Sequence, residues 1–166
     1  MLILADMDGV TCHFVPAVCR EYKLATGKDL MPKDITDWDM GKFGVKGEMW
    51  QKPGFFRSLE PIEGAVEVLW LLHQHGHKIW IVTDAMDLSF VEKEKAEWVK
   101  EYIPFVNGIV FTNQKDKIPG DIIIEDAPHH LERHPATTIK MKHPYNEGVL
   151  ADHEVEGWEG VKEILC

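Results

Sequence analysis

Residues 2–10 read Leu2-Ile3-Leu4-Ala5-Asp6-Met7-Asp8-Gly9-Val10, a short apolar run that leads directly into two carboxylates and a glycine. An apolar run of this length that ends at a glycine is typical of a buried strand in a parallel sheet. If the chain turns at Met7 or Asp8, Asp6 lies at the carboxyl end of the strand and Asp8 lies just beyond it. Open α/β sheets bind their ligands at this edge. The stretch therefore predicts a functional site at the end of the first strand.

Two neighbouring carboxylates are costly to ionise together unless a cation or a shared proton offsets their repulsion. Asp6 and Asp8 therefore indicate either a bound metal or a catalytic pair. The plainer alternative is a strand followed by an ordinary Asp-Gly turn.

The composition is that of a globular domain. The chain has 166 residues, of which 45% are hydrophobic and 28% are charged, enough for one domain with a sizeable core. The formal net charge of −10 argues against binding to a nucleic acid polymer or to an anionic membrane. If the substrate is an anion, a divalent metal and a few placed lysines have to reverse the local field.

The cysteines and the apolar runs predict a location. Three cysteines without metal-ligand spacing, Cys12, Cys19 and Cys166, fit a reducing compartment. We expect Cys12 to be a small buried side chain and not a nucleophile. The first strand is too short, and too soon followed by acids, for a signal peptide, and no apolar run has membrane-spanning length. We therefore expect a cytoplasmic protein.

Apolar strands alternate with amphipathic helices along the chain. The expected strands after the first are residues 78–85, 108–112, 121–126 and 137–141. The expected helices are residues 11–25, with Thr11 as the N-cap, and residues 65–76, 89–102 and 157–165. This alternation predicts an α/β fold with a doubly wound, mostly parallel sheet.

The region from Lys28 to Leu59 differs from the rest. Its glycines and prolines break any long element, and its aromatic residues argue against disorder. We predict a small helical cap insert over residues 11–59, with residues 1–10 and 60–166 forming the core. Within the insert, Asp37-Trp38-Asp39 is interpreted as a helix N-cap beside a packed tryptophan, and contact with a ligand is the alternative.

Three apolar strands end in polar groups: Asp6 and Asp8, then Thr83, then Glu125 and Asp126. Because parallel strands point the same way, these ends meet at one edge of the sheet. A hard divalent cation stabilises such a carboxylate cluster, and Mg²⁺ matches oxygen ligands. Lys115, after the third strand, can hold a phosphate there, with Lys93, Lys95 and Lys117 as rivals.

These motifs resemble those of the haloacid dehalogenase (HAD) superfamily of phosphotransferases over nearly the whole chain. The first motif matches Asp6-Met7-Asp8-Gly9-Val10 and the second matches Ile81-Val82-Thr83-Asp84. The third matches Lys115, and the fourth matches Ile124-Glu125-Asp126. Within that superfamily the chain is most similar to the 5'(3')-deoxyribonucleotidases, on residues 54–66, 94–99 and 126–128. The resemblance implies a Rossmann-like core.

The resemblance also implies roles for these residues. Asp6 would be the nucleophile that forms an aspartyl-phosphate, and Asp8 would protonate the leaving oxygen and then activate water. The implied ligands of Mg²⁺ are Asp6, the carbonyl of Asp8, and Glu125 or Asp126. Thr83, the backbone N–H of Asp84, and Lys115 would hold the phosphoryl oxygens.

The resemblance places Phe14 against a nucleobase, while packing in the core is the alternative for this residue. The chain departs from the subfamily at Glu125, where an Asp is common, and at Asp84, where we expect only the backbone to take part. The predicted function is a Mg²⁺-dependent phosphomonoesterase that acts on nucleoside monophosphates, a small-molecule phosphomonoester. One alternative is a phosphatase for a sugar phosphate or another small metabolite. The other is a non-catalytic, receiver-like phosphate-binding module.

Overall fold

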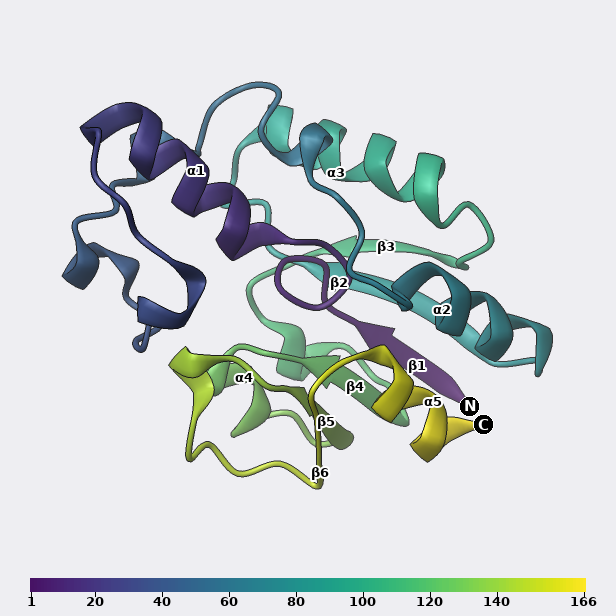
Figure 1. Cartoon of the computed structure of the whole chain (residues 1–166). Helices are drawn as coiled ribbons and strands as arrows, with labels where there is room; N and C mark the ends of the chain where they lie inside the picture. Colours follow the sequence, from purple (N-terminus) through teal and green to yellow (C-terminus); the bar gives the residue numbers. More distant parts are fainter.

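The computed structural model describes all 166 residues, and its centre is a six-stranded sheet in which every strand is parallel to its neighbours (Figure 1). The strands lie in the order β3-β2-β1-β4-β5-β6. They are β1 (Leu2–Ala5), β2 (Lys78–Thr83), β3 (Gly108–Phe111), β4 (Ile122–Glu125), β5 (Thr137–Met141) and β6 (His153–Val155).

The order of the strands reverses at β1. The chain moves outward from β1 through β2 to β3 on one side, and β4 then pairs with the other side of β1. Ala5 consequently lies between Ile81 of β2 and Ile124 of β4. The carboxyl ends of these two neighbours of β1 therefore flank the residue that follows it. Such a reversal point is where open α/β sheets bind ligands.

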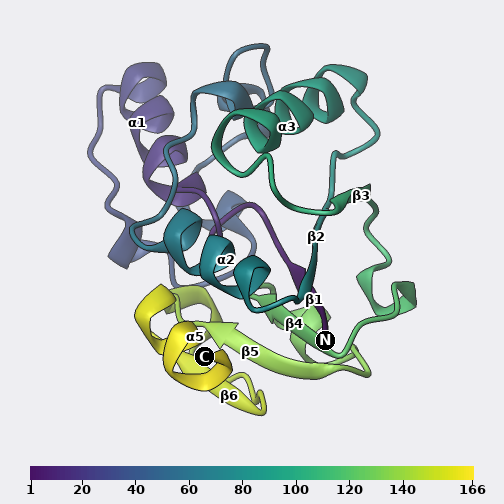
Figure 2. The same ribbon diagram turned by 90° about the vertical axis from the view of Figure 1, so that its right-hand side faces the viewer.

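The helices are α1 (Phe14–Thr26), α2 (Ala65–Gln74), α3 (Ser89–Tyr102), α4 (Pro128–Leu131) and α5 (Trp158–Leu165). Short 3-10 helices join them, over residues 32–34, 40–43, 47–49, 56–58, 115–117 and 144–146. Figure 2 shows α2 and α5 side by side against the sheet.

Strand residues alternate between the two faces of the sheet, and the faces bury different clusters. Ile3 and Ala5 belong to the main core, which includes Leu69 of α2 and Trp98 of α3. Leu4, between them in the sequence, belongs instead to a small cluster on the opposite face. The helices α2, α3 and α5 therefore cover the face that carries most of the core.

The five strands expected from the sequence are confirmed, and the first helix begins later than expected. It starts at Phe14 with His13 as its N-cap, so the expectation for Thr11 is wrong. The Thr11 hydroxyl instead donates to the Met7 carbonyl, 3.0 Å away, inside the tight loop after β1. Gly27 ends the helix in the left-handed region, at a φ of 72°.

The segment between α1 and α2 contains only short 3-10 helices, which fits its many breakers. Asp39 caps one of them by accepting from the Gly41 N–H at 3.0 Å, as expected. Trp38 packs edge to face against His129 and Tyr145, with ring centroids 5.4 and 5.5 Å apart, although 48% of it is exposed. The expectation of a packed tryptophan beside the cap is therefore confirmed.

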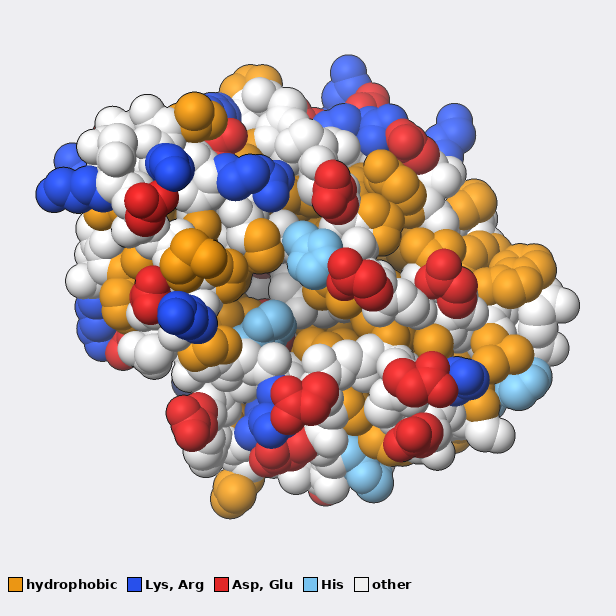
Figure 3. Space-filling view, viewed as in Figure 1, with side chains coloured by type: hydrophobic (Ala, Val, Ile, Leu, Met, Phe, Trp, Pro, Cys, Tyr) orange, Lys and Arg blue, Asp and Glu red, His pale blue; other side chains and the backbone are white.

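The three cysteines are free thiols, and Cys12 is buried, as expected. None of the helices has both the length and the apolar character required to cross a membrane. Figure 3 shows acidic and basic side chains interspersed over one face of the molecule, with apolar side chains between them.

Candidate active site

A cavity of about 350 Å³ opens where the carboxyl ends of β1, β2 and β4 meet. Of the residues predicted for the site, seven line it, and they are Asp6, Asp8, Phe14, Thr83, Asp84, Lys115 and Asp126. Glu125, the eighth, is fully buried directly behind this wall. The structure therefore brings together all the segments that the sequence pattern selected.

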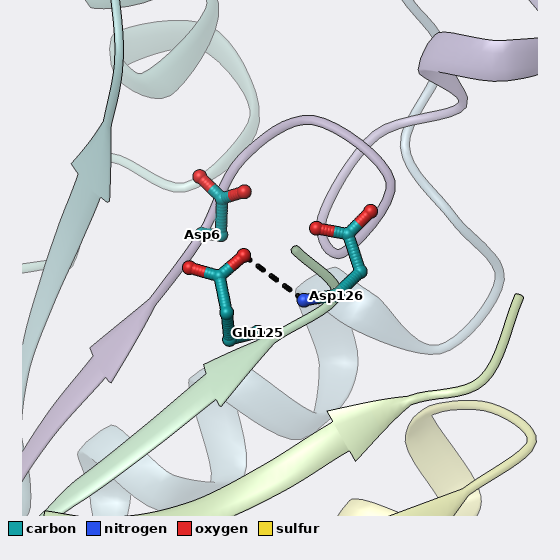
Figure 4. Close-up of side chains that lie close together, drawn as sticks. All are labelled: Asp6, Glu125 and Asp126. Carbon is teal, nitrogen blue, oxygen red and sulfur yellow. Dashed lines mark hydrogen bonds between the residues drawn. The ribbon is translucent and has the colours of Figure 1, made fainter. Parts of the chain in front are cut away.

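Three carboxylates form a compact cluster at the reversal point of the sheet (Figure 4). Asp6, Glu125 and Asp126 each offer an oxygen, and these oxygens lie within 4.8 Å of one another. The cluster forms because β1 and β4 are hydrogen-bonded neighbours, with the Asp6 N–H donating to the Ile124 carbonyl at 3.0 Å.

Lys115 lies between two of these carboxylates. Its ammonium is 2.7 Å from Asp6 Oδ1 and 2.7 Å from Glu125 Oε2, and only 3% of its side chain is exposed. Burial disfavours the charged ammonium, but Asp6 and Glu125 outweigh burial and raise the pKa of Lys115. Lys115 therefore stays charged and holds Asp6 Oδ1, which leaves the other oxygen of Asp6 for chemistry.

Glu125 is fully engaged by protein groups. Its Oε2 accepts from Lys115, and its Oε1 accepts from the backbone N–H groups of Asp126 and Ala127, both at 3.0 Å. Burial opposes ionisation of Glu125, but Lys115 and these backbone donors outweigh it and lower the pKa of the carboxyl. Glu125 is therefore a carboxylate that orients its neighbours.

Asp126 is different, because one of its oxygens has no partner. The Tyr145 hydroxyl donates to Oδ2, whereas Oδ1 is buried without any hydrogen bond. Burial, and next the charges of Glu125 and Asp6, raise the pKa of Asp126 well above its usual range. A cation bound by Oδ1 would relieve both the missing partner and the repulsion.

Asp8 lines the cavity outside this cluster and shares a hydrogen-bond partner with Thr83. Burial raises the pKa of Asp8, as it does that of Asp6, where the charge of Glu125 adds to the effect. Lys95 of α3 donates to Asp8 Oδ2 at 2.6 Å and to Thr83 Oγ1 at 2.8 Å. Of the four lysines that the sequence offered, two thus contact site residues, Lys115 holding Asp6 and Lys95 holding Asp8.

The loop after β2 carries Asp84 into the cavity wall and is strained beyond it. The Asp84 carboxylate accepts from the Met86 N–H at 2.7 Å, so its charge is engaged within its own loop. Met86 and Asp87 both have φ near the left-handed region, at 53° and 54°. Residues other than glycine rarely adopt this conformation, and such strain clusters at functional sites.

The start of α1 and the segment between α1 and α2 supply most of the apolar wall of the cavity. Phe14 meets Trp50 edge to face, with ring centroids 5.1 Å apart, and both line the cavity together with Trp38 and Met40. Phe14 also packs against the main core. Both expectations for Phe14, core packing and contact with a ligand, are thus compatible with its position.

Three further residues that line the cavity were not predicted from the sequence, namely His129, His130 and Tyr145. His129 and His130 lie three and four residues after Asp126 of the fourth motif, in a helix that begins at Pro128, and the proline was the available signal. Tyr145 lies in a loop whose sequence has no periodicity, so no pattern pointed to it.

With this geometry described, comparison with solved structures defines the class of fold. A HAD family hydrolase from Deinococcus radiodurans, solved with bound phosphate and sodium, superposes with a TM-score of 0.69 at 17% identity, covering 99% of this chain and 94% of that one. A Bacillus subtilis protein provisionally named a HAD hydrolase, solved with magnesium, gives a TM-score of 0.64 at 14% identity, covering 99% and 97%. The fold is therefore that of the HAD hydrolases.

The sequence comparisons identify a particular family within this class of fold. The model of the family described as 5' nucleotidase, deoxy (pyrimidine), cytosolic type C protein matches residues 1–166, and the chain belongs to this family. A Staphylococcus epidermidis protein provisionally named 5'(3')-deoxyribonucleotidase is 35% identical, with 98% of this chain and 94% of the relative covered. The 5'(3')-deoxyribonucleotidase of Bacillus subtilis is 28% identical, with 99% and 98% covered. The chain is accordingly an enzyme, a phosphoric monoester hydrolase of the nucleotidase type.

Proposed function

We propose that this protein hydrolyses deoxyribonucleoside or ribonucleoside monophosphates to nucleoside and phosphate, with Mg²⁺ as cofactor and an aspartyl-phosphate on Asp6 as intermediate. The observation that carries the proposal is the meeting of Asp6, Asp8, Thr83 and Lys115 at one cavity beside the unpartnered oxygen of Asp126. The family and the names of the relatives support a nucleotide as the substrate.

The residues present fit a hard divalent cation. Carboxylate and carbonyl oxygens suit Mg²⁺, and Asp126 Oδ1 is buried without a partner. We assign Asp6, Asp126 and the main-chain carbonyl of Asp8 as the ligands. Glu125, whose oxygens are engaged by Lys115 and two backbone groups, orients this set and reaches the metal only if one of those contacts is released. When bound, the metal supplies positive charge to the phosphoryl oxygens.

In the first step, the free oxygen of Asp6 attacks phosphorus and forms the O–P bond of an aspartyl-phosphate. The bond from phosphorus to the ester oxygen breaks, and that oxygen keeps the electron pair and takes a proton from Asp8. In the second step, Asp8 accepts a proton from water, the water oxygen bonds to phosphorus, and the bond to Asp6 breaks. Thr83, Lys115 and the Asp84 N–H hold the phosphoryl oxygens throughout.

The shape of the cavity supports a substrate with a flat apolar part. Its wall next to the acidic end is built from the aromatic and methionine side chains Phe14, Trp38, Trp50, Met40 and Met86. A nucleobase fits such a wall better than a sugar phosphate, which offers only hydroxyl groups to it. A sugar phosphate is the second candidate, because the site at the phosphate end does not depend on the rest of the molecule.

The test is a panel of phosphomonoesters with and without Mg²⁺. We expect phosphate release from deoxyribonucleoside monophosphates that stops when the metal is chelated and falls by at least about a thousandfold in Asp6→Asn. The exposed variant Asp29→Asn serves as the control and should keep full activity. Normal turnover in Asp6→Asn would disprove the covalent route, and equal rates on sugar phosphates would favour the second candidate.

A further inference from the structure

Lys95 is the one ammonium in the site that contacts neither the acid cluster nor the cavity. Lys95 belongs to α3, its side chain is fully buried, and it does not line the cavity. The ammonium donates to Asp8 Oδ2 at 2.6 Å, to Thr83 Oγ1 at 2.8 Å and to the Asp84 carbonyl at 2.7 Å. The Phe56 ring lies below it, with its centroid 4.9 Å from Nζ.

These contacts use the whole hydrogen-bonding capacity of the group. An ammonium has three N–H donors and no acceptor, and Lys95 has three acceptors. It therefore has no donor left for a phosphoryl oxygen, unlike Lys115, which lines the cavity. Burying an ammonium costs several kcal/mol, and a buried ion pair is weak evidence for stability. The position of Lys95 thus calls for a role other than holding substrate or strengthening the core.

We propose that Lys95 is a positioning residue for the proton transfer, and the proposal rests on the function proposed above. By donating to Asp8 Oδ2, Lys95 fixes the plane of that carboxyl and leaves Oδ1 to carry the proton. Oδ1 has only a weak thiol contact, with Cys12 Sγ 3.7 Å away. Asp8 is thereby held in one orientation toward the ester oxygen, which receives the proton together with the electron pair of the breaking bond.

The same ammonium orients Thr83. Because Thr83 Oγ1 accepts from Lys95, its own hydroxyl proton has to point elsewhere, and the cavity lies on that side of the residue. Lys95 thus sets the direction in which Thr83 donates, and it does so equally for every phosphomonoester. Only its effect through Asp8 depends on which group leaves.

This difference gives the test. The kcat/KM of Lys95→Met is measured on p-nitrophenyl phosphate, whose leaving group departs without a proton, and on a deoxyribonucleoside 5'-monophosphate, whose leaving alkoxide needs one. Since kcat/KM includes the first transfer, in which the ester bond breaks, we expect the loss on the nucleotide to exceed the loss on the aryl ester at least about tenfold. Asp8→Asn should show the same skew, and the double variant should show no further skew.

The ratio of the two substrates is taken within one preparation, so a smaller folded fraction lowers both rates and leaves the ratio unchanged. If Lys95→Met does not fold, the ratio is read from Lys95→Gln, which keeps a donor at the site. Lys93→Met, an exposed lysine of the same helix, is the matched control and should not change either rate.

The outcomes separate the two proposals. A wild-type protein that hydrolyses neither ester would overturn both the proposed function and the role of Lys95. A wild-type protein active on both, with equal losses in Lys95→Met, or with a skew that adds to that of Asp8→Asn, would overturn the role of Lys95 alone.

Discussion

At the scale of single residues, Gly9 decides where Asp126 can lie. Its φ is +77°, and a Cβ at this position would stand 2.3 Å from Asp126 Oδ2 and 3.0 Å from the Tyr145 hydroxyl. Both the backbone conformation and the space therefore require glycine. The absence of one side chain after β1 makes room for a carboxylate after β4.

We expect Gly9→Ala to displace Asp126 and to weaken Mg²⁺ binding. The matched control is Gly27→Ala, which has a φ of +72° with nothing within 4 Å of the added Cβ. In both variants the left-handed backbone should lower the free energy of unfolding by about 1 kcal/mol, and only in Gly9→Ala should the free energy of unfolding fall further. The measurement is the rise in melting temperature on adding Mg²⁺, and an equal rise in both variants would contradict the expectation.

Sequence patterns predicted which residues form the site, but they did not predict which role each of two similar residues has. They selected Lys115 and named Lys95 as a rival, while the structure places both in the site with different partners. They could not choose between Glu125 and Asp126, because the choice depends on which oxygens Lys115 and the backbone occupy. Such pairings are set by side-chain directions that adjacent positions in a sequence do not determine.

At the scale of elements, α3 connects the apolar wall of the cavity with its acidic end. Glu94 accepts from the Gly54 N–H at 2.5 Å and from the Arg57 N–H at 3.2 Å, and so holds the segment that leads back to α2. The next residue in the helix, Lys95, contacts Asp8. Movement of this helix would therefore disturb both sides of the cavity together.

We expect Glu94→Ala to loosen the segment from residue 52 to residue 58. Two hydrogen bonds to a carboxylate are lost, which should lower the free energy of unfolding by about 1–3 kcal/mol. Trypsin should then cut after Arg57 faster than in the wild-type protein, as read by mass spectrometry. Glu163→Ala, at an exposed glutamate of α5, is the control and should leave the cutting rate unchanged; unchanged cutting in Glu94→Ala as well would show that Glu94 does not hold the segment.

The longer elements could be predicted because their apolar patterns span several residues. The strand β6 was missed, since it has three residues and two of them are exposed. The helix α4 was missed as well, because its four residues, which include Pro128, are too few to show a helical period. Both depend on packing against neighbours that a local pattern does not reveal.

At the scale of the whole molecule, folding makes several histidines harder to protonate. Burial lowers the pKa of His129, His130, His134 and His143. For His130, burial and next the charge of Lys115 lower the pKa from 6.5 to about 4. Between these values His130 binds more protons in the unfolded chain than in the folded protein, so its contribution to stability rises with pH across this window. The raised pKa values of Asp6, Asp8 and Asp126 act in the opposite direction.

We expect the contribution of His130 to the free energy of unfolding to decrease by up to about 3 kcal/mol as the pH falls from 6.5 to 4. In His130→Asn this contribution should be absent, because asparagine does not titrate, so the difference in unfolding free energy between the variant and the wild-type protein should change with pH across the window. Urea unfolding at several pH values measures it, with His75→Asn, an exposed position, as the control. A His130→Asn curve parallel to that of the wild-type protein would refute the assignment.

The central place of β1 also bears on how the protein is made. During synthesis β1 precedes β2 and β3, and β4 follows them. Until β4 is made, the edge of β1 that faces it has no partner strand. A nascent chain that stops before residue 122 therefore lacks two of the clustered carboxylates and presents an unpaired apolar edge. Incomplete translation should therefore yield a fragment that is catalytically inactive and prone to aggregate.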